Sequence, residues 1–194
     1  MPTQFPQERP MTDSSGPFSF LSRRRFLRMS LAAGGGLLAV TGGGLFALRG
    51  RAPSVDHLRL LDDHAYQTLQ SLVAVMFPRT DAIPVDTPSM DLPRTFDTFL
   101  ADEPQHNIDD LQRALTLVEF GPLVFDRRVA TFSRLPADER ATHWESWGVA
   151  EQLVRRQVSI AMRKFFNLVF FDRPEVWPHI GYPGPSFQQP QEGL

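Results

Sequence analysis

The chain contains no cysteine among its 194 residues. This absence excludes a disulfide, a thiolate nucleophile, a cysteine-bound iron–sulfur cluster and covalently attached C-x-x-C-H haem from the chain itself. Other catalytic motifs are missing too, because the sequence has no H-E-x-x-H or H-x-x-E-H pair, no G-x-S-x-G turn and no P-loop. We therefore expect this chain to contribute no catalytic residue, no metal site and no cofactor-binding residue.

Two short patterns match a metal-binding or a dinucleotide-binding motif only in part. His143 and Glu145 have an H-x-E spacing, but residues two apart on a helix point in different directions and cannot share one ion. Residues 42–47 match the G-x-G-x-x-A dinucleotide fingerprint, yet the strand that must precede that motif is missing. The alternative that remains open is a stand-alone exported enzyme built around His143, Glu145 or His179.

Signals for β-structure are also missing. No segment alternates apolar and polar residues over the length of a strand, and no Asn-Gly hairpin turn or internal repeat is present. Apolar residues instead recur at spacings of three and four, which predicts an all-α domain of about five helices. We expect helices over residues 62–77, 93–101, 107–120, 136–148 and 149–171, the last being the longest. Gly121 and Pro122 are expected to stop the third helix.

The last of these helices has two different halves. We place Val154 and Leu168 on its buried stripe and Arg155 and Arg156 on its polar face. Residues 165–171 are apolar nearly all round, which predicts burial on every side, either by the domain itself or by another chain. Of these two, we favour burial within the domain.

Charge divides the chain near residue 52. Residues 1–52 carry a net charge of +5, whereas residues 53–194 hold 13 basic and 20 acidic side chains, a net charge of −7. These last 142 residues suffice for one domain with a hydrophobic core. The acidic balance argues against nucleic acid and against anionic lipid as partners of that domain.

The basic N-terminal region contains a transport motif. It consists of Ser22, Arg23, Arg24, Phe26, Leu27 and Arg28. This S-R-R-x-F-L-R pattern resembles the twin-arginine export signal, S-R-R-x-F-L-K, which directs folded proteins to the twin-arginine translocase. We therefore divide the chain into a signal region, residues 1–52, and a helical domain, residues 53–194.

The apolar residues 29–48 follow the motif and are as long as a membrane span, which needs about 20 residues. Two glycine runs, residues 34–36 and 42–44, make this stretch less apolar than an ordinary span. We favour a removable signal over a permanent anchor for that reason. The cleavage site is poor, since Pro53 follows the small residues that a peptidase would need, so retention as an anchor stays open. With a retained anchor, a second alternative to a subunit is a membrane-tethered binding protein.

Residues 172–194 form a tail rich in proline, glycine and aromatic side chains. Prolines stiffen its backbone and large rings supply contact area, which suits docking either on the chain's own helices or in a partner's groove. Composition favours neither. The expected partner-binding residues are Phe170, Phe171, Trp177, Tyr182, Pro183 and Phe187.

Taken together, these segments resemble the gluconate 2-dehydrogenase small-subunit family, also called subunit three or gamma. The resemblance rests on the leader, the cysteine-free helical domain, the sequence MFPRTD at residues 76–81 and the sequence PEVWPHIGYPGP at residues 174–185. It implies a non-catalytic subunit bound to a large flavoprotein subunit of the glucose-methanol-choline oxidoreductase type, which holds FAD. A multihaem cytochrome c subunit often completes such a complex.

The same resemblance implies a route of export. In that family the flavin subunit commonly has no signal of its own and is exported bound to the small subunit. We expect this chain in the periplasm or on the outer face of the cytoplasmic membrane. The sugar or alcohol substrate would be recognised by the partner.

Overall fold

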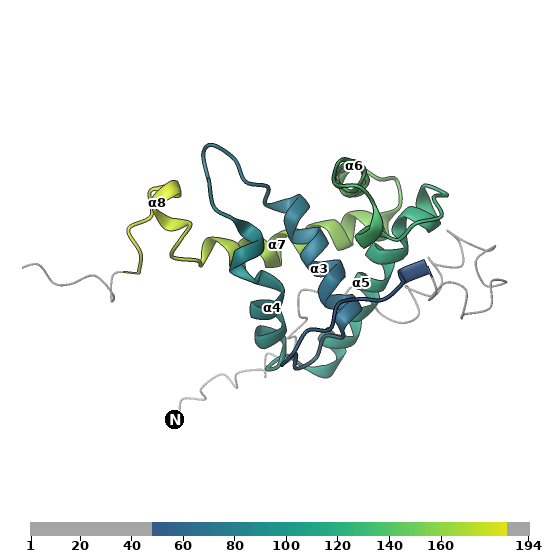
Figure 1. Ribbon diagram of the computed structural model, residues 1–194, viewed down its shortest axis with the longest axis horizontal. Helices are drawn as coiled ribbons and strands as arrows, with labels where there is room; N and C mark the ends of the chain where they lie inside the picture. The colour runs from purple at the N-terminus through teal and green to yellow at the C-terminus, as the bar shows by residue number, and fades with distance from the viewer. Residues whose placement is uncertain (1–47, 186–194) are drawn as a thin grey trace, which may run out of the picture.

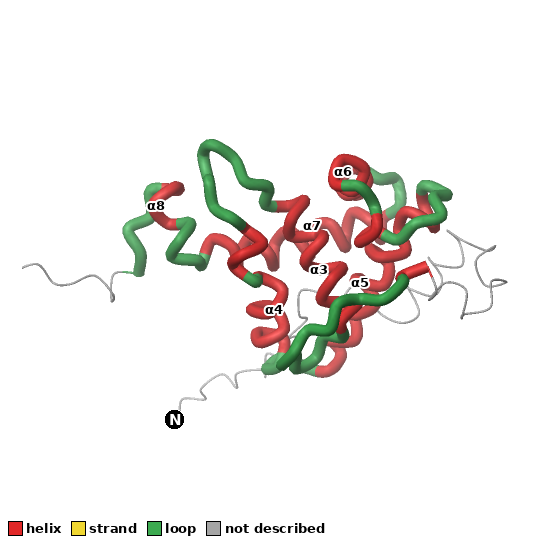
Figure 2. The backbone as a smooth tube through the Cα atoms, viewed as in Figure 1, coloured by secondary structure: helices red, strands yellow, loops and turns green. Residues whose placement is uncertain are grey.

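The computed structural model describes residues 48–185, and every regular element in that range is helical (Figures 1 and 2). The α-helices are α3 (Asp63–Met76), α4 (Leu92–Leu100), α5 (Gln105–Phe125), α6 (Ala137–Gly148), α7 (Leu153–Phe171) and α8 (Trp177–Ile180). Two short 3-10 helices, η2 (Thr87–Met90) and η3 (Phe132–Arg134), lie between them. The prediction of an all-α domain is confirmed. The transport motif and Phe187 lie outside the described residues.

Local signals set most of the helix starts. The side chain of Asp62 accepts a hydrogen bond of 2.6 Å from the Ala65 amide and so caps α3, as its sequence predicts. Asp91 caps α4 in the same way from a left-handed conformation with φ 44°. In α6, Asp138 and Glu139 occupy the first turn, where the helix dipole favours negative charge.

The core is an aromatic layer around α3. This helix packs against α4, α5 and α6, while α7 crosses behind it and contacts α4 and α6 (Figure 1). The Phe96 ring on α4 stacks on Phe166 of α7 at 5.1 Å and meets the Phe165 ring edge-on at 4.3 Å. Trp144 and Trp147 of α6 are 1% and 0% exposed. Burying each of these side chains stabilises the fold by about 1.5–3 kcal/mol.

The prediction that Gly121 and Pro122 stop the third helix is wrong, because α5 continues through both to Phe125. A Cβ atom at Gly121 would stand 2.8 Å from both His143 Nε2 and the Trp147 ring, so glycine lets α5 approach α6 closely. The Phe125 ring then meets Trp147 edge-on at 5.7 Å. This packing offsets the roughly 3 kcal/mol that an internal proline costs a helix. At 21 residues, α5 is longer than α7, which has 19.

Three expectations for α7 are also wrong. The helix begins at Leu153 rather than at residue 149, because the carbonyls of residues 150 and 151 turn to accept hydrogen bonds from Arg156 Nη1. Leu168 is 63% exposed, because the side of the helix that faces the core holds Met162, Phe166 and Phe170 instead. Residues 165–171 are therefore not all buried within the domain, which was the favoured alternative, and burial by another chain stays a prediction.

Arg155, expected on the polar face, is 8% exposed. Its guanidinium carbon lies 4.7 Å from the Phe125 ring centroid and 5.5 Å from that of Trp147, and Nη2 donates a hydrogen bond of 2.5 Å to Ser146 Oγ. Burial lowers the pKa of this guanidinium. Cation–π contacts and a hydroxyl acceptor compensate for burying the charge.

Candidate partner-binding surface

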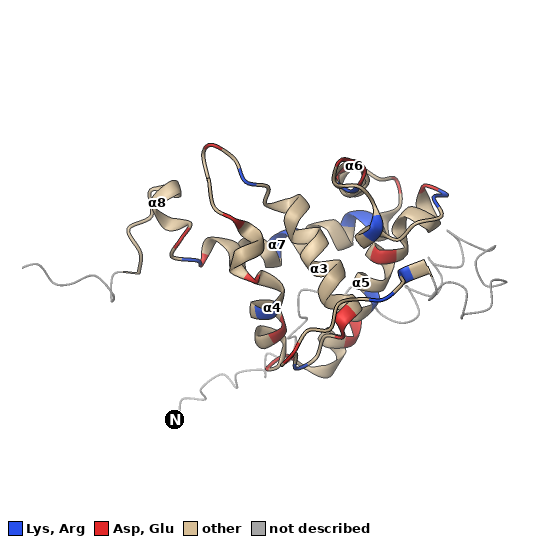
Figure 3. Ribbon diagram, in the orientation of Figure 1, with Lys and Arg blue, Asp and Glu red and all other residues tan. Residues whose placement is uncertain are grey.

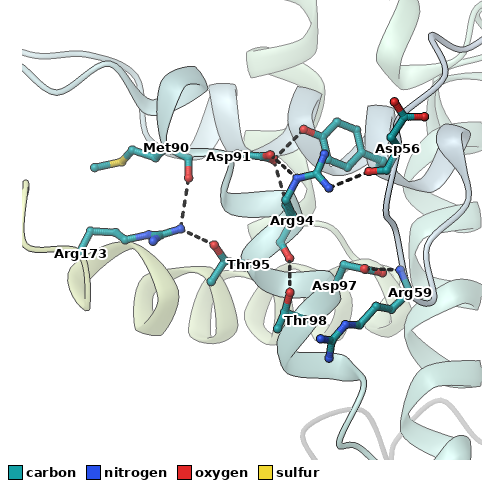
Figure 4. Close-up of polar contacts among 10 residues, drawn as sticks. Asp56, Arg59, Met90, Asp91, Arg94, Thr95, Asp97, Thr98 and Arg173 are labelled. Atoms are coloured by element: carbon teal, nitrogen blue, oxygen red, sulfur yellow. Dashed lines mark hydrogen bonds and ion pairs between the residues drawn. The ribbon is translucent and has the colours of Figure 1, made fainter.

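The tail is anchored to the helical domain by the first residues after α7. Arg173 Nη2 donates hydrogen bonds to the Met90 carbonyl, at 3.1 Å, and to Thr95 Oγ1 (Figure 4). Val176 follows and is 0% exposed within the hydrophobic core. The direction in which the tail leaves the domain is thus fixed by a charged anchor and an apolar one.

A polar network lies next to this anchor, at the start of α4 (Figure 4). Asp91 Oδ1 accepts a hydrogen bond of 2.6 Å from Tyr66, and Oδ2 accepts one of 2.7 Å from Arg94 Nε. Arg94 Nη1 also donates to the Asp56 carbonyl at 2.8 Å. Burial and the Asp91 carboxylate raise the pKa of Tyr66 to about 12, so its hydroxyl remains a donor throughout the neutral range.

Asp97 holds a second segment against α4. The carboxylate is 1% exposed and accepts three backbone hydrogen bonds, from the amides of Arg59, Leu60 and Leu61 at 2.6, 2.9 and 2.8 Å. Figure 4 shows it beside the Arg59 backbone and one helical turn from the Arg94 network. The segment that leads into α3 and the root of the tail are therefore both fixed to α4.

Beyond its root, the tail folds around Trp177. The indole Nε1 donates a hydrogen bond of 3.0 Å to the Phe171 carbonyl, and the Tyr182 ring meets the indole edge-on at 5.4 Å. Gly184 adopts φ +89°, and a Cβ atom there would lie 3.1 Å from the indole. This glycine allows both the left-handed backbone and the close approach. The described part of the tail, residues 172–185, is held in shape by its own ring contacts.

Large apolar side chains are left exposed around this element. Leu168 and Phe171 at the end of α7 are 63% and 41% exposed, and Ile180 and Tyr182 in the tail are 42% and 44% exposed. We call these four residues the tail surface. None of the residues of α8 is buried, and this helix lies beyond the end of α7, away from α5 and α6 (Figure 1).

The expected contact residues differ in how far the structure buries them. Phe170 is 3% exposed and stacks on Phe77 with a centroid distance of 4.2 Å, so its ring is covered within the domain. Trp177 is half-buried, and its ring supports Tyr182. Pro183 is exposed beside them. Sequence reasoning missed Arg173 as the anchor, because its acceptors lie 78 and 83 residues away along the chain.

His143, the centre of the alternative enzyme hypothesis, is engaged on both sides of its ring. Its Nδ1 lies 2.5 Å from Asp126 Oδ2, and its Nε2 accepts a hydrogen bond of 2.9 Å from Trp147 Nε1. The imidazole is 4% exposed, and burial lowers its pKa. With Nδ1–H donating to the carboxylate and Nε2 accepting from the indole, the neutral ring has no nitrogen left for a substrate. Glu145 is exposed and takes no part in this contact.

Glu119 is a second buried acid whose acceptor capacity is used internally. It is 2% exposed, and its carboxylate accepts hydrogen bonds from the Thr68 hydroxyl, the Ser133 amide and the Ser133 hydroxyl at 2.7–3.1 Å. These bonds tie η3 to α3 and α5. Within residues 48–185, His, Asp and Glu side chains form no group of three or more that could hold a metal ion.

Comparison with known proteins adds no relative, since no protein-family model, curated protein or solved structure matches this chain. Among residues 48–185, no helix is both long and apolar enough to span a membrane.

Proposed function

We propose that this chain is the non-catalytic small subunit of an exported, flavin-dependent sugar or alcohol dehydrogenase complex. It binds the FAD-containing large subunit in the cytoplasm, supports its folding and carries it through the twin-arginine translocase. The complex then works in the periplasm or on the outer face of the cytoplasmic membrane. A cytochrome c subunit would accept the electrons.

The observation that carries this proposal is the ordered but exposed tail surface. Ile180 and Tyr182 present apolar area on a tail held by Arg173 and by the Trp177 contacts, and Leu168 and Phe171 present apolar area at the end of α7. An apolar surface that is ordered before binding loses little conformational entropy when a partner covers it. Aromatic residues of this kind are enriched in the parts of protein interfaces that contribute most to affinity.

Electrostatics and polar contacts support a role without chemistry of its own. Of the three residues in the alternative enzyme hypothesis, His143 is buried with both ring nitrogens engaged, whereas Glu145 and His179 are exposed. The export motif and the family resemblance supply the identity of the partner. The twin-arginine pathway exports folded proteins, so a signal of this type on this chain is consistent with a bound partner that has already taken up its cofactor.

Co-purification tests the proposal. The full chain is tagged and co-expressed with a flavoprotein dehydrogenase large subunit, and the purified material is assayed for bound FAD and dehydrogenase activity. We expect a stable complex that Ile180→Ser with Tyr182→Ser weakens at least tenfold, because two apolar contacts of the tail surface are lost. Val129→Ser is the control, since Val129 is 79% exposed and lies between α5 and η3. A flavoprotein that purifies without this chain under all conditions contradicts the proposal.

A further inference from the structure

The outer face of α7 continues the exposed apolar residues of the tail surface along the whole helix. Leu153 and Ile160 are 51% and 53% exposed, and Leu168 and Phe171 follow at 63% and 41%. At 3.6 residues per turn, Leu153, Ile160 and Phe171 point within about 20° of one another, and Leu168 within about 80°. The same side also holds Gln157, Lys164 and Asn167, so the outer side of α7 combines apolar and polar residues.

Three cations lie on the same side of α7, with Arg156 and Arg163 along one edge of the apolar row and Lys164 among its members. The charged residues of α7 are all basic, and Figure 3 shows blue segments along this helix. Arg155 is buried, Arg156 is half-buried, and Arg163 and Lys164 are exposed. Within the described residues, none of these three has a carboxylate at ion-pair distance. Arg163 instead donates to Ser159 Oγ at 3.3 Å and lies 5.8 Å from the Trp144 ring centroid.

This basic helix belongs to an acidic domain. Outside α7, residues 53–194 contain nine basic and 20 acidic side chains, a net charge of −11. Cations without a carboxylate partner and exposed apolar side chains are therefore gathered on one helix of an acidic domain. Its charge is complementary to an acidic surface.

We infer that the outer face of α7 binds a protein surface with an apolar centre and a rim of carboxylates, on the same partner that covers the tail surface. This inference rests on the proposed function and defines the chemistry of the partner's contact face. The carboxylates would meet the exposed Arg163 and Lys164, while apolar side chains beside them would cover Ile160, Leu168 and Phe171.

Charge argues against the other occupants. Residues 1–47 of this chain carry a net positive charge, so they would be repelled by the same cations. A second copy joined by a two-fold axis would place α7 cations near their own counterparts. An anionic membrane would attract α7 but repel the rest of the domain, whose net charge is −11 outside this helix.

Site-specific cross-linking in cells tests the contact directly. A photo-cross-linking amino acid replaces Ile160, Tyr182 or, as the control, Val129 in the full chain, which is co-expressed with the flavoprotein large subunit. We expect cross-links to that subunit from positions 160 and 182 and none from position 129. Cross-links from 182 without any from 160 overturn the inference about α7 and leave the proposed function standing.

Other products of the same experiment are equally decisive. No flavoprotein from either position means that the proposed function fails. Products from position 160 that contain a second copy of this chain or phospholipid overturn the inference. Phosphatidylglycerol vesicles mixed with the purified full chain check the last outcome, and binding that Arg163→Glu with Lys164→Glu abolishes would assign the face to a membrane.

Reversing the charge of two α7 cations tests whether carboxylates of the partner contact this helix. Arg163→Glu with Lys164→Glu should weaken binding of the large subunit about tenfold or more and reduce its salt dependence, because exposed charges are screened within about 10 Å at 0.1 M salt. Arg59→Glu with Arg79→Glu makes the same change in net charge at two exposed positions outside α7 and should change binding less than twofold. Equal effects of the two pairs overturn the inference. Thermal unfolding of both variants verifies that each is folded.

Discussion

Replacing Gly184 by alanine should loosen the tail without affecting the core. Gly184 has φ +89°, and an alanine Cβ would lie 3.1 and 3.2 Å from two carbons of the Trp177 ring. A left-handed conformation costs a residue with a Cβ atom about 1–2 kcal/mol, and the tight contact adds to this. We expect Gly184→Ala to destabilise the folded tail by about 2 kcal/mol, which is about 30-fold in its opening equilibrium.

Hydrogen exchange of the Tyr182 amide reports this opening. The amide donates to the Trp177 carbonyl at 3.1 Å, so it exchanges only when the tail opens. Its exchange should accelerate about 30-fold, while the free energy of unfolding of the whole domain changes by less than about 0.5 kcal/mol. Affinity for the large subunit should fall by up to the same factor, because the partner must then supply the ordering free energy.

Substitutions at two other glycines distinguish the effect of backbone strain from that of the tight contact with Trp177. Gly148→Ala is the control, since no atom lies within 4 Å of its added Cβ and its φ is not positive. Gly181→Ala keeps open space but has φ +70°, so it isolates the backbone strain and should give a smaller acceleration, about fivefold for about 1 kcal/mol. Unchanged Tyr182 exchange in Gly184→Ala, or an equal change in Gly148→Ala, would refute the reasoning.

Three further predictions concern the domain. Asp97→Ala should lower the free energy of unfolding in urea by about 2–4 kcal/mol, because three buried backbone donors lose their acceptor, whereas exposed Asp102→Ala should change it by less than about 0.5 kcal/mol. Phe166→Ala should cost about 3–5 kcal/mol and Leu168→Ala less than about 0.5 kcal/mol by the same assay, and equal costs would contradict the assigned orientation of α7. Burial lowers the pKa of His143 from its usual 6.5, so below that pH the unfolded chain binds a proton that the folded chain does not. The free energy of unfolding is thus highest above pH 6.5 and declines as the pH falls. Urea titrations between pH 7.5 and 5 should show a shallower decline of this free energy with pH in His143→Gln than in the wild type. An identical pH dependence in both proteins would contradict a neutral, buried His143 ring.

Local signals in the sequence were enough for the helix boundaries that depend on them. Asp62 caps α3 at the expected residue, and Gly148 ends α6 as expected. Pro122 misled the prediction because its cost is offset by contacts with α6, which lie beyond the local sequence. A proline rule describes an isolated helix, whereas tertiary packing decides the outcome here.

The orientation of α7 shows a similar limit. Its end is apolar on nearly every side, so periodicity could not distinguish buried Phe166 from exposed Leu168. Arg155 was assigned to solvent by its charge, although the rings of Phe125 and Trp147 give it a buried position. At the candidate site, composition identified the aromatic tail but not Arg173, whose acceptors come from distant residues.

The central claim is that this chain carries a flavoprotein across the membrane by binding it. The direct measurement is FAD-dependent dehydrogenase activity in the periplasmic fraction of cells that express the large subunit with the wild-type chain, without the chain, or with Arg23→Lys and Arg24→Lys together. We expect periplasmic activity only with the wild-type chain, and an active complex retained in the cytoplasm with the double variant. Equal periplasmic activity in all three cultures would contradict the account.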